Sequence, residues 1–450
     1  MTALRRLLVP ACVAWVGACS GGRVEVQLRV PAGDHPLVGA DRVALSVRDG
    51  GGALLAFATS GAGASELRLP PVPAGSGYTV EVEARVGADV LARGRSCRFD
   101  VNAAAPPRVP VWFSRVGRFA PTASPHVARD GAVAVGWAGG ALVAGGNGTG
   151  APLASSESYD ATTAAFRDGP MLSTGRAGAQ AVDLGDGTVL IIGGAVSGAP
   201  ALEALAPTHT TPEPAGLSPD LVGHAAARLG DGRVIIAGGL VAGAPTATAW
   251  LATDGGATVE AAPALGQARA RLTLTATSDD RFAPLYVVGG VGAAGPVAEL
   301  ELFDPVASAF SDTGLRLATP RADHSTTRLP SGLLLVVGGV DASGAPLASA
   351  ELIDPAAHTV RAAGRLRTAR AHHAATLLPT GRLLISGGVD ASGAPMGDAE
   401  IFDPSLGADG DFVPTASLAA PRAGHTLVPL CDGTLVVVGG GAGAEIYNPL

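Results

Sequence analysis

The sequence contains no lysine, so arginine supplies all 31 basic residues, and only 16% of the chain is charged. No run of five or more basic residues occurs, which excludes the electrostatic footprint of a nucleic-acid-binding protein. No apolar span long enough to cross a bilayer occurs after the N-terminal segment, so the mean hydropathy of +0.33 comes from short apolar runs. Glycine, by contrast, occurs 64 times and proline 34 times. A chain of 450 residues is too long for one ordinary compact domain unless it is built from repeats.

The N-terminal segment has the pattern of an export signal and not of a folded element. Arg5 and Arg6 precede an apolar stretch over residues 7–16, and small residues then lead to Cys19. The tetrapeptide that ends at Cys19 resembles the lipobox of bacterial lipoproteins, in which the cysteine sulfur carries the lipid. The resemblance implies that residues 1–18 are a lipoprotein signal peptide and that Cys19 anchors the mature chain to a membrane. The alternative is an ordinary signal peptide with a chance cysteine.

The residue after the lipobox bears on localisation. Ser20, and not aspartate, follows Cys19. By resemblance to Gram-negative lipoproteins this favours sorting to the outer membrane, so we expect a protein of the cell envelope. Loss of residues 1–18 removes two arginines and no acid, which changes the formal charge from −8 to −10.

Residues 19–116 alternate apolar and polar side chains in short runs, as in Val43, Leu45 and Val47. About seven such runs in about 90 residues favour a small β-sandwich. The stretch at 69–86, LPPVPAGSGYTVEVEARV, resembles transthyretin-like or immunoglobulin-like modules. No catalytic cluster occurs in this segment. We therefore expect it to serve as a spacer or packing module, with ligand binding as the alternative.

The rest of the chain repeats one pattern. LLLVVGGVDASGAPLASAELIDP at 333–355 returns as LLISGGVDASGAPMGDAEIFDP at 383–404. Diglycines recur at nearly even intervals throughout this part of the chain. A period of about 45–50 residues with several short strands per unit predicts the blades of a propeller. The diglycines are Gly145 and Gly146, Gly193 and Gly194, Gly238 and Gly239, Gly289 and Gly290, Gly338 and Gly339, Gly387 and Gly388, and Gly439 and Gly440.

Further positions recur around each diglycine. Arg-x-x-His opens most units, and Glu-x-Φ-Asp-Pro follows the diglycine, where Φ is apolar or aromatic. A later phenylalanine or aliphatic residue completes the unit. This pattern resembles the kelch repeat and implies a seven-bladed propeller over residues 117–450. Two departures occur: phenylalanine or valine replaces the usual fourth-strand tryptophan, and the second and third units are degenerate after the diglycine.

The last unit ends before its fourth strand. The missing sequence stands at the other end of the repeats, because FAPTAS at 119–124 parallels FVPTAS at 412–417. We therefore expect residues 117–124 to form the outer strand of the last blade. Such closure would remove two exposed sheet edges. The predicted fold is all-β: a seven-bladed kelch-type β-propeller over 117–450, preceded by the module at 19–116.

None of the recurring residues predicts a cofactor, a metal or a catalytic site. The diglycines allow positive φ and close approach, and no helix start follows them, which excludes a phosphate loop. Four histidines share one fixed spacing from the diglycine that follows them: His224, His324, His373 and His425. Equivalent points on neighbouring blades lie about 10 Å apart, whereas zinc ligands lie about 2 Å from one ion. We therefore expect these histidines to make structural hydrogen bonds.

The recurring charges have a structural interpretation. Four arginines also share one fixed spacing from the diglycine that follows them, and a glutamate recurs after the diglycine. Symmetric pairs of this kind predict ion pairs, since catalysis needs one asymmetric constellation. Binding at the channel rim is the alternative for the arginines. Asp341 and Asp390 stand in identical loops that offer too few oxygen ligands for calcium, so they are interpreted as turn residues. The residues that we take as a candidate binding face are Arg176, Arg321, Arg370, Arg422, Asp341 and Asp390.

Two cysteines remain after export, Cys97 and Cys431, in a compartment where disulfides persist. Cys431 stands in the turn between the first two strands of the last blade. That turn lies on the face where the outer strand begins, and residues 117–124 supply this strand. The N-terminal module must then lie on the same face, and we predict a disulfide between Cys97 and Cys431. The opposite face is left free for a partner.

The symmetry of the repeats favours a non-enzymatic lipoprotein that binds protein or glycan through its free loop face, with no cofactor. A purely structural envelope component is a second possibility. The alternative is an extracytoplasmic carbohydrate-active enzyme of the oxidase or isomerase type, because kelch propellers include copper-radical oxidases and other propellers are sugar isomerases. The oxidases need tyrosine and histidine copper ligands and a tyrosine crosslinked to cysteine, and no such set is evident. We therefore expect that the chain is not an enzyme.

Overall fold

The computed structural model describes seven stretches of the chain. Strands β1 to β40 and one 3-10 turn, η1 (Asp254–Gly256), form within them, so the all-β class is confirmed. No helix in these stretches has the length and apolar character needed to cross a bilayer. The expected signal peptide and the expected lipidation at Cys19 lie outside the described residues. The stretches are 23–64, 67–102, 106–194, 202–206, 213–214, 221–441 and 443–449.

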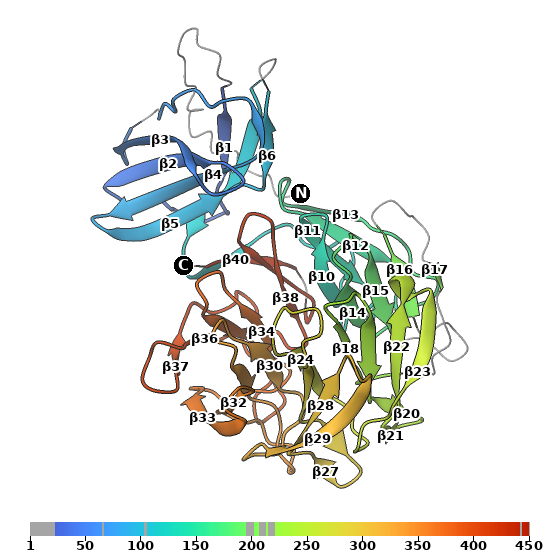
Figure 1. The fold of residues 1–450 in the computed structure, drawn as a ribbon. Helices are drawn as coiled ribbons and strands as arrows, with labels where there is room; N and C mark the ends of the chain where they lie inside the picture. Colours follow the sequence, from blue (N-terminus) through green and yellow to red (C-terminus); the bar gives the residue numbers. More distant parts are fainter. Residues whose placement is uncertain are drawn as a thin grey trace.

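The N-terminal part contains two sheets (Figure 1). β1 and β7 pair in parallel, and the larger sheet has the order β3-β2-β4-β5-β8, with β6 on β4. Alternating apolar residues such as Val80, Val111 and Phe113 meet in one buried cluster. The strands are β1 (Glu25–Arg29), β2 (Arg42–Arg48), β3 (Leu54–Gly61), β4 (Gly75–Val86), β5 (Asp89–Arg95), β6 (Phe99–Val101), β7 (Arg108–Trp112) and β8 (Ser114–Arg115).

Seven four-stranded antiparallel sheets follow in the described part of the chain, each built around one diglycine. The strand before each diglycine is an apolar run, such as Leu334–Val337, that is buried along its whole length. Sheets 1 to 3 contain β10 (Val133–Trp137), β11 (Gly140–Ala144), β12 (Ser156–Asp160) and β13 (Ala165–Asp168); β14 (Gln180–Asp183), β15 (Val189–Ile192), β16 (Leu202–Leu205) and β17 (Glu213–Pro214); and β18 (Ala225–Arg228), β19 (Val234–Ala237), β22 (Ala249–Thr253) and β23 (Thr258–Ala262).

Sheets 4 to 7 continue the same pattern. Two short hairpins stand after the diglycines of sheets 3 and 4: β20 (Leu240–Val241) with β21 (Ala244–Pro245), and β26 (Val291–Gly292) with β27 (Gly295–Pro296). Sheets 4 to 7 contain β24 (Thr273–Ala276), β25 (Leu285–Val288), β28 (Glu299–Asp304) and β29 (Ala309–Arg316); β30 (Ser325–Arg328), β31 (Leu334–Val337), β32 (Ser349–Asp354) and β33 (Thr359–Arg365); β34 (Ala374–Leu377), β35 (Leu383–Ser386), β36 (Ala399–Asp403) and β37 (Asp411–Pro414); and β38 (Thr426–Pro429), β39 (Leu435–Val438), β40 (Glu445–Asn448) and β9 (Arg118–Pro121).

The first strand of each sheet contacts the first strands of its two neighbours. The contacts run from β10 through β14, β18, β24, β30 and β34 to β38, and β38 contacts β10 again. Figure 1 shows these inner strands toward the middle of the group of sheets. The outer strand of sheet 7 is β9, which pairs with β40 through partners such as Phe119 and Tyr447. Residues from both ends of the repeats therefore share one sheet, as the FAPTAS parallel predicts.

The N-terminal sheets are held against sheet 7 by specific contacts. The Asn448 side-chain amide donates to the carbonyl oxygens of Arg93 and Ser114, at 2.8 and 2.9 Å. Trp112 packs in a cluster with residues of sheets 1 and 7. A disulfide joins Cys97 to Cys431, with 4.9 Å between their Cα atoms.

We expect the non-reduced protein to be lighter than the reduced protein by the mass of two hydrogens. Cys97→Ser with Cys431→Ser should lower the free energy of unfolding by about 2–5 kcal/mol, because the bridge restricts the unfolded chain over a long loop. Intact mass and denaturant unfolding measure the two effects. The Asn448 and Trp112 contacts remain in the double serine variant. Free thiols in the non-reduced protein, or equal stability with and without reductant, would contradict the pairing.

Candidate functional site

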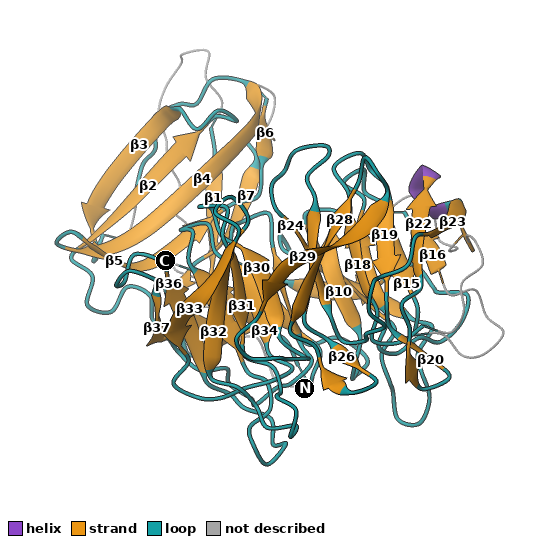
Figure 2. Ribbon diagram, turned by 60° about the horizontal axis from the view of Figure 1, so that its bottom comes forward, coloured by secondary structure: helices purple, strands orange, loops and turns teal. Residues whose placement is uncertain are grey.

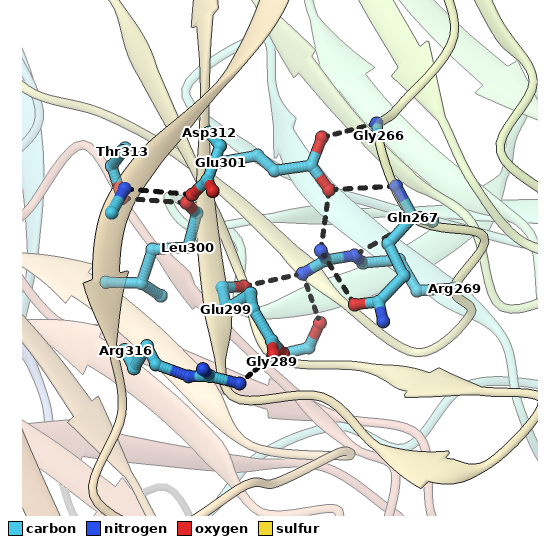
Figure 3. A network of polar contacts seen from close by, with 11 residues as sticks. Gly266, Gln267, Arg269, Gly289, Glu299, Leu300, Glu301, Asp312, Thr313 and Arg316 are labelled. Carbon is cyan, nitrogen blue, oxygen red and sulfur yellow. Dashed lines mark hydrogen bonds and ion pairs between the residues drawn. The ribbon is translucent and has the colours of Figure 1, made fainter.

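Within the described residues, six of the seven sheets contain a buried arginine paired with a glutamate, and Figure 3 shows one of these pairs. Arg269 Nη2 donates to Glu301 Oε1 at 2.6 Å, and Nη1 donates to the Gly289 carbonyl oxygen. The carboxylate also accepts backbone N–H groups from Gly266 and Gln267. The six pairs are Arg129 with Glu157, Arg176 with Glu203, Arg269 with Glu301, Arg321 with Glu351, Arg370 with Glu400, and Arg422 with Glu445.

This placement corrects part of the expected binding face. The side chains of Arg176, Arg321 and Arg370 have no exposed surface, and the side chain of Arg422 is 2% exposed. Their donors are used inside the sheet, so none of the four can contact a ligand at the surface. The ion-pair interpretation describes them. Arg129 and Arg269 were missed because their spacing from the diglycine differs from the spacing that the other four share.

The diglycines connect neighbouring sheets. Gly290 donates its N–H to the carbonyl oxygen of Arg321, the buried arginine of the next sheet. A Cβ atom on Gly289 would lie 2.5 Å from that same oxygen, and both glycines have positive φ. Any other residue at Gly289 would therefore force the two sheets apart.

The four recurring histidines also lie between sheets. His324 packs against Gly289 of the preceding sheet, and its Nε2 lies 3.2 Å from Thr273 Oγ1. Burial lowers the pKa of His224 to about 4 and the pKa of His324, His373 and His425 to about 3. No group of three His, Cys, Asp or Glu able to hold a metal ion occurs in the described stretches. His373 and His425 bond through Nε2 to serine hydroxyls, whereas neither ring nitrogen of His224 has a hydrogen-bond partner among the described residues, so the expected bonds form at three of the four.

Asp341 and Asp390 are the two residues of the expected binding face that reach the surface. Asp341 Oδ1 accepts from the backbone N–H and the hydroxyl of Ser343 and from the N–H of Ala345. Asp390 makes the same bonds in its own loop. The Ser343 hydroxyl bond and these N–H bonds lower the pKa of Asp341. Both carboxylates therefore fold their loops, as the turn interpretation describes.

A different position distinguishes the sheets from one another. It is the third residue of the Arg-x-x-His motif, immediately before or near the start of each inner strand. All seven residues at this position have positive φ, between 52 and 69°. Four are glycine, and three are residues for which this conformation is uncommon. The seven are Gly131, Gly178, Gly223, Arg271, Asp323, His372 and Gly424.

The three exceptions stand on sheets 4, 5 and 6, and Asp323 lies next to each of the other two. Arg271 Nη1 donates to Asp323 Oδ2 at 2.8 Å, and His372 Nδ1 lies 3.8 Å from Asp323 Oδ1. The Asp323 side chain is 7% exposed, whereas those of Arg271 and His372 are 44% and 48% exposed. We call Arg271, Asp323 and His372 the mouth cluster, because they lie where the inner strands of sheets 4, 5 and 6 begin. It is the asymmetric constellation that a symmetric repeat otherwise lacks.

Backbone bonds around the inner strands hold the mouth cluster in place. Arg271 donates its N–H to the Gly223 carbonyl oxygen, His372 to that of Asp323, and Gly424 to that of His372. The preceding residues pair with the segments after the diglycines, for example Ala270 with Val291 of β26. Figure 2 shows β20 and β26 on the side away from the N-terminal sheet. The mouth cluster therefore lies on the face opposite the N-terminal module.

The mouth cluster was not predicted from the sequence, because its residues do not recur from one repeat to the next. Aligning the repeats shows the signal: at a position that is glycine in four units, Arg271, Asp323 and His372 carry polar side chains. Left-handed backbone costs a residue with a Cβ about 1–2 kcal/mol. Nine non-glycine residues of the described stretches have positive φ, and the three that share this position of the motif form the candidate functional site.

The arrangement has a defined chemical capacity. Asp323 faces Nδ1 of His372, and a carboxylate at this nitrogen leaves Nε2 available as a general base or acid. Arg271 holds the same carboxylate from its other side. Asp323 is thus a positioning residue between two half-exposed donors. A separate hollow of about 330 Å³ lies over the outer face of the N-terminal sheet, beside Phe57 and Glu81.

Comparison with known proteins gives a likeness of structure only. No family model and no curated protein matches the chain. Solved structures do match, among them a fungal alcohol oxidase of the AA5 family in complex with copper. The match has a TM-score of 0.58 and 18% sequence identity, and it covers 74% of this chain and 77% of the oxidase. At this identity the likeness shows the β-rich fold.

The expectation that the chain is not an enzyme is overturned by this comparison, because the matched structure is a copper alcohol oxidase. Copper itself does not fit the described residues. Tyr159 and Tyr447 direct their hydroxyls to Thr122 and Thr415, and no metal-binding group of His, Cys, Asp or Glu is present in these stretches. The two described cysteines are bonded to each other, so neither is free to crosslink a tyrosine.

Proposed function

We propose that the chain is a kelch-type β-propeller lipoprotein of the cell envelope and a carbohydrate-active enzyme of the isomerase type. Seven consecutive four-stranded sheets with mutually contacting inner strands, all within the described residues, support a seven-bladed propeller over residues 117–450. The separate buried cluster of the N-terminal sheets supports a sandwich module at 19–116. The Cys19 lipobox supports a membrane anchor, and Ser20 after it supports an outer-membrane location.

The mouth cluster is the observation that carries the enzymatic proposal. A half-exposed imidazole next to a nearly buried carboxylate, both on backbone of positive φ, supports a catalytic role. His372 and Arg271 are both about half exposed, so a ligand on this face can reach them. Isomerisation is redox-neutral and needs only proton transfer, which a positioned histidine supplies.

The proposed reaction is the opening and closing of a sugar ring. His372 Nε2 takes the proton of the anomeric hydroxyl of a cyclic sugar. The bond between the anomeric carbon and the ring oxygen then breaks, and its electron pair moves to the ring oxygen. The imidazolium returns its proton to that oxygen and leaves an open-chain carbonyl sugar, which closes again from either side of the carbonyl. Asp323 lies beside Nδ1 of His372, at 3.8 Å, and leaves Nε2 directed away from the carboxylate.

Exchange spectroscopy on a panel of reducing sugars, with the full chain in detergent, tests this function. His372→Gly is expected to slow the catalysed exchange by about 10²–10⁴-fold, the usual contribution of a general base. Four other sheets already have glycine at this position with similar positive φ, so the variant should fold. His358→Gln, in an exposed turn between β32 and β33, is the matched control and should exchange at the wild-type rate.

No acceleration by the wild-type protein over buffer for any sugar would overturn the proposal. So would equal rates for wild type and His372→Gly. Thermal unfolding of both variants, measured in the same buffer, separates loss of catalysis from loss of fold.

A further inference from the structure

We infer that the ligand of the mouth cluster is an acidic sugar, whose carboxylate binds to Arg271. The inference rests on the proposed function and adds the substrate class. It starts from the direction in which the polar atoms of the mouth cluster are used.

Both carboxylate oxygens of Asp323 already face a group of the mouth cluster. Its Oδ2 accepts from Arg271 Nη1, and its Oδ1 faces His372 Nδ1. Its side chain is nearly buried, whereas those of Arg271 and His372 are about half exposed. A molecule that approaches the mouth cluster from solvent therefore meets the Arg271 guanidinium and the His372 ring more readily than the carboxylate.

Arg271 keeps most of its donors open. The bond to Asp323 is the one hydrogen bond of its guanidinium within the described stretches, so Nε and Nη2 face no protein acceptor there. The Arg271 stem lies against Gly223, where a Cβ would be 3.4 Å from Cγ. A glycine at this neighbouring position thus leaves room for the arginine to cross toward Asp323.

An arginine edge with two free N–H groups matches a carboxylate, which it binds through two parallel hydrogen bonds. The six arginines inside the sheets provide the contrast. Arg321, for example, directs its donors to Glu351, Gly338 and Ser349. Arg271 is distinguished by position and by open donors, as expected for a residue that recognises a ligand.

Nearby acidic groups do not compete for this edge. Asp341 follows Val340, which pairs with Ala322 beside Asp323, so its loop lies on the same face. Its carboxylate is turned into its own loop and accepts three bonds there. Asp390 is held in the same way.

The test compares sugars that differ only at C6. D-galacturonate and D-galactose form one pair, and D-glucuronate and D-glucose the other. Binding by titration calorimetry and isomer exchange by NMR are measured for the full chain in detergent. We expect the wild-type protein to prefer the acid of each pair by at least about 10-fold, the scale of one charge-assisted bidentate contact.

Arg271→Gln should lower the ratio of acid to neutral sugar by about 10-fold or more, and Arg271→Lys by less. Arg167→Gln, an exposed arginine on the outer strand of sheet 1, is the control and should keep the wild-type ratio. Equal binding and turnover of acidic and neutral sugars by the wild type would reject the acidic-sugar inference and leave the isomerase. Absence of binding and turnover for all four sugars would reject the acidic-sugar inference, and the wider panel of reducing sugars then decides whether the isomerase is rejected too.

Discussion

Replacing Arg321 by leucine is expected to lower the free energy of unfolding by about 3–5 kcal/mol. Glu351 would then stay buried with its charge and lose its guanidinium partner, which lies 2.7 Å away. The carbonyl oxygens of Gly338 and Ser349 would lose their donor at the same time. Denaturant unfolding at neutral pH measures the loss.

The third sheet suggests how the loss can be reduced. It has Leu221 where the other sheets have arginine, and Trp250 where they have glutamate, because Trp250 pairs with Ile236 as Glu351 pairs with Val336. Both residues pack in one apolar cluster. Sheet 3 therefore has an apolar pair at the two positions where the other six sheets have the ion pair.

A double-mutant cycle tests the same exchange in sheet 5. Arg321→Leu with Glu351→Leu should cost less than the sum of the two single changes, with a coupling of about 2 kcal/mol. Recovery will be incomplete, since Ala318 and Thr319 lose the carboxylate that accepts their N–H groups. Additive costs would show that the pair is not coupled, and a single variant as stable as wild type would contradict the buried-charge argument.

Acidification is the second change with a large expected effect. Burial, and next the nearby Arg321, hold the pKa of His324 at about 3, and His224, His373 and His425 behave alike with pKa values of about 3 to 4. In the unfolded chain these groups have a pKa near ~6.5. Between these values the unfolded state binds more protons, so stability is complete above about pH 6.5 and falls as the pH falls toward 3–4.

Each buried histidine should contribute up to about 1.4 kcal/mol of lost stability per pH unit in this window. Urea unfolding at several values between pH 7.5 and 4.5 measures the slope. His324→Leu is the matched variant, because Leu272 stands in the equivalent place against the diglycine of sheet 3. It should reduce the slope by about one histidine's share. A slope that His324→Leu does not change would contradict the assignment.

The repeat-level features could be predicted because each is stated many times in the chain. Seven diglycines, with apolar runs before them, predicted seven similar units, and the FAPTAS parallel predicted which residues pair with β40. The proximity of Cys97 and Cys431 followed from the alternation of strand direction together with the expected place of residues 117–124 in the last sheet. Features that every unit shares are constrained by packing. The residues that pack therefore recur in the sequence at the period of the repeat.

The candidate site could not be found by the same reasoning. Arg271, Asp323 and His372 are departures from the repeat, and a pattern of recurring residues does not include departures. Their proximity depends on the adjacency of sheets 4, 5 and 6. It also depends on a positive φ that these residue types do not predict. The recurring arginines were predicted to form ion pairs but were also included in the expected binding face, and their burial excludes that second role.

The pairing of β9 with β40 has a consequence for biosynthesis. Sheet 7 needs residues 118–121 and residues 445–448 together, so its outer strand β9 is synthesised long before its neighbour β40. Until then β9 is a lone strand and sheet 1 has no neighbour on one side, an edge open to wrong partners. Synthesis of residues 445–448, and not of any earlier unit, is therefore the step that allows β9 to pair in sheet 7.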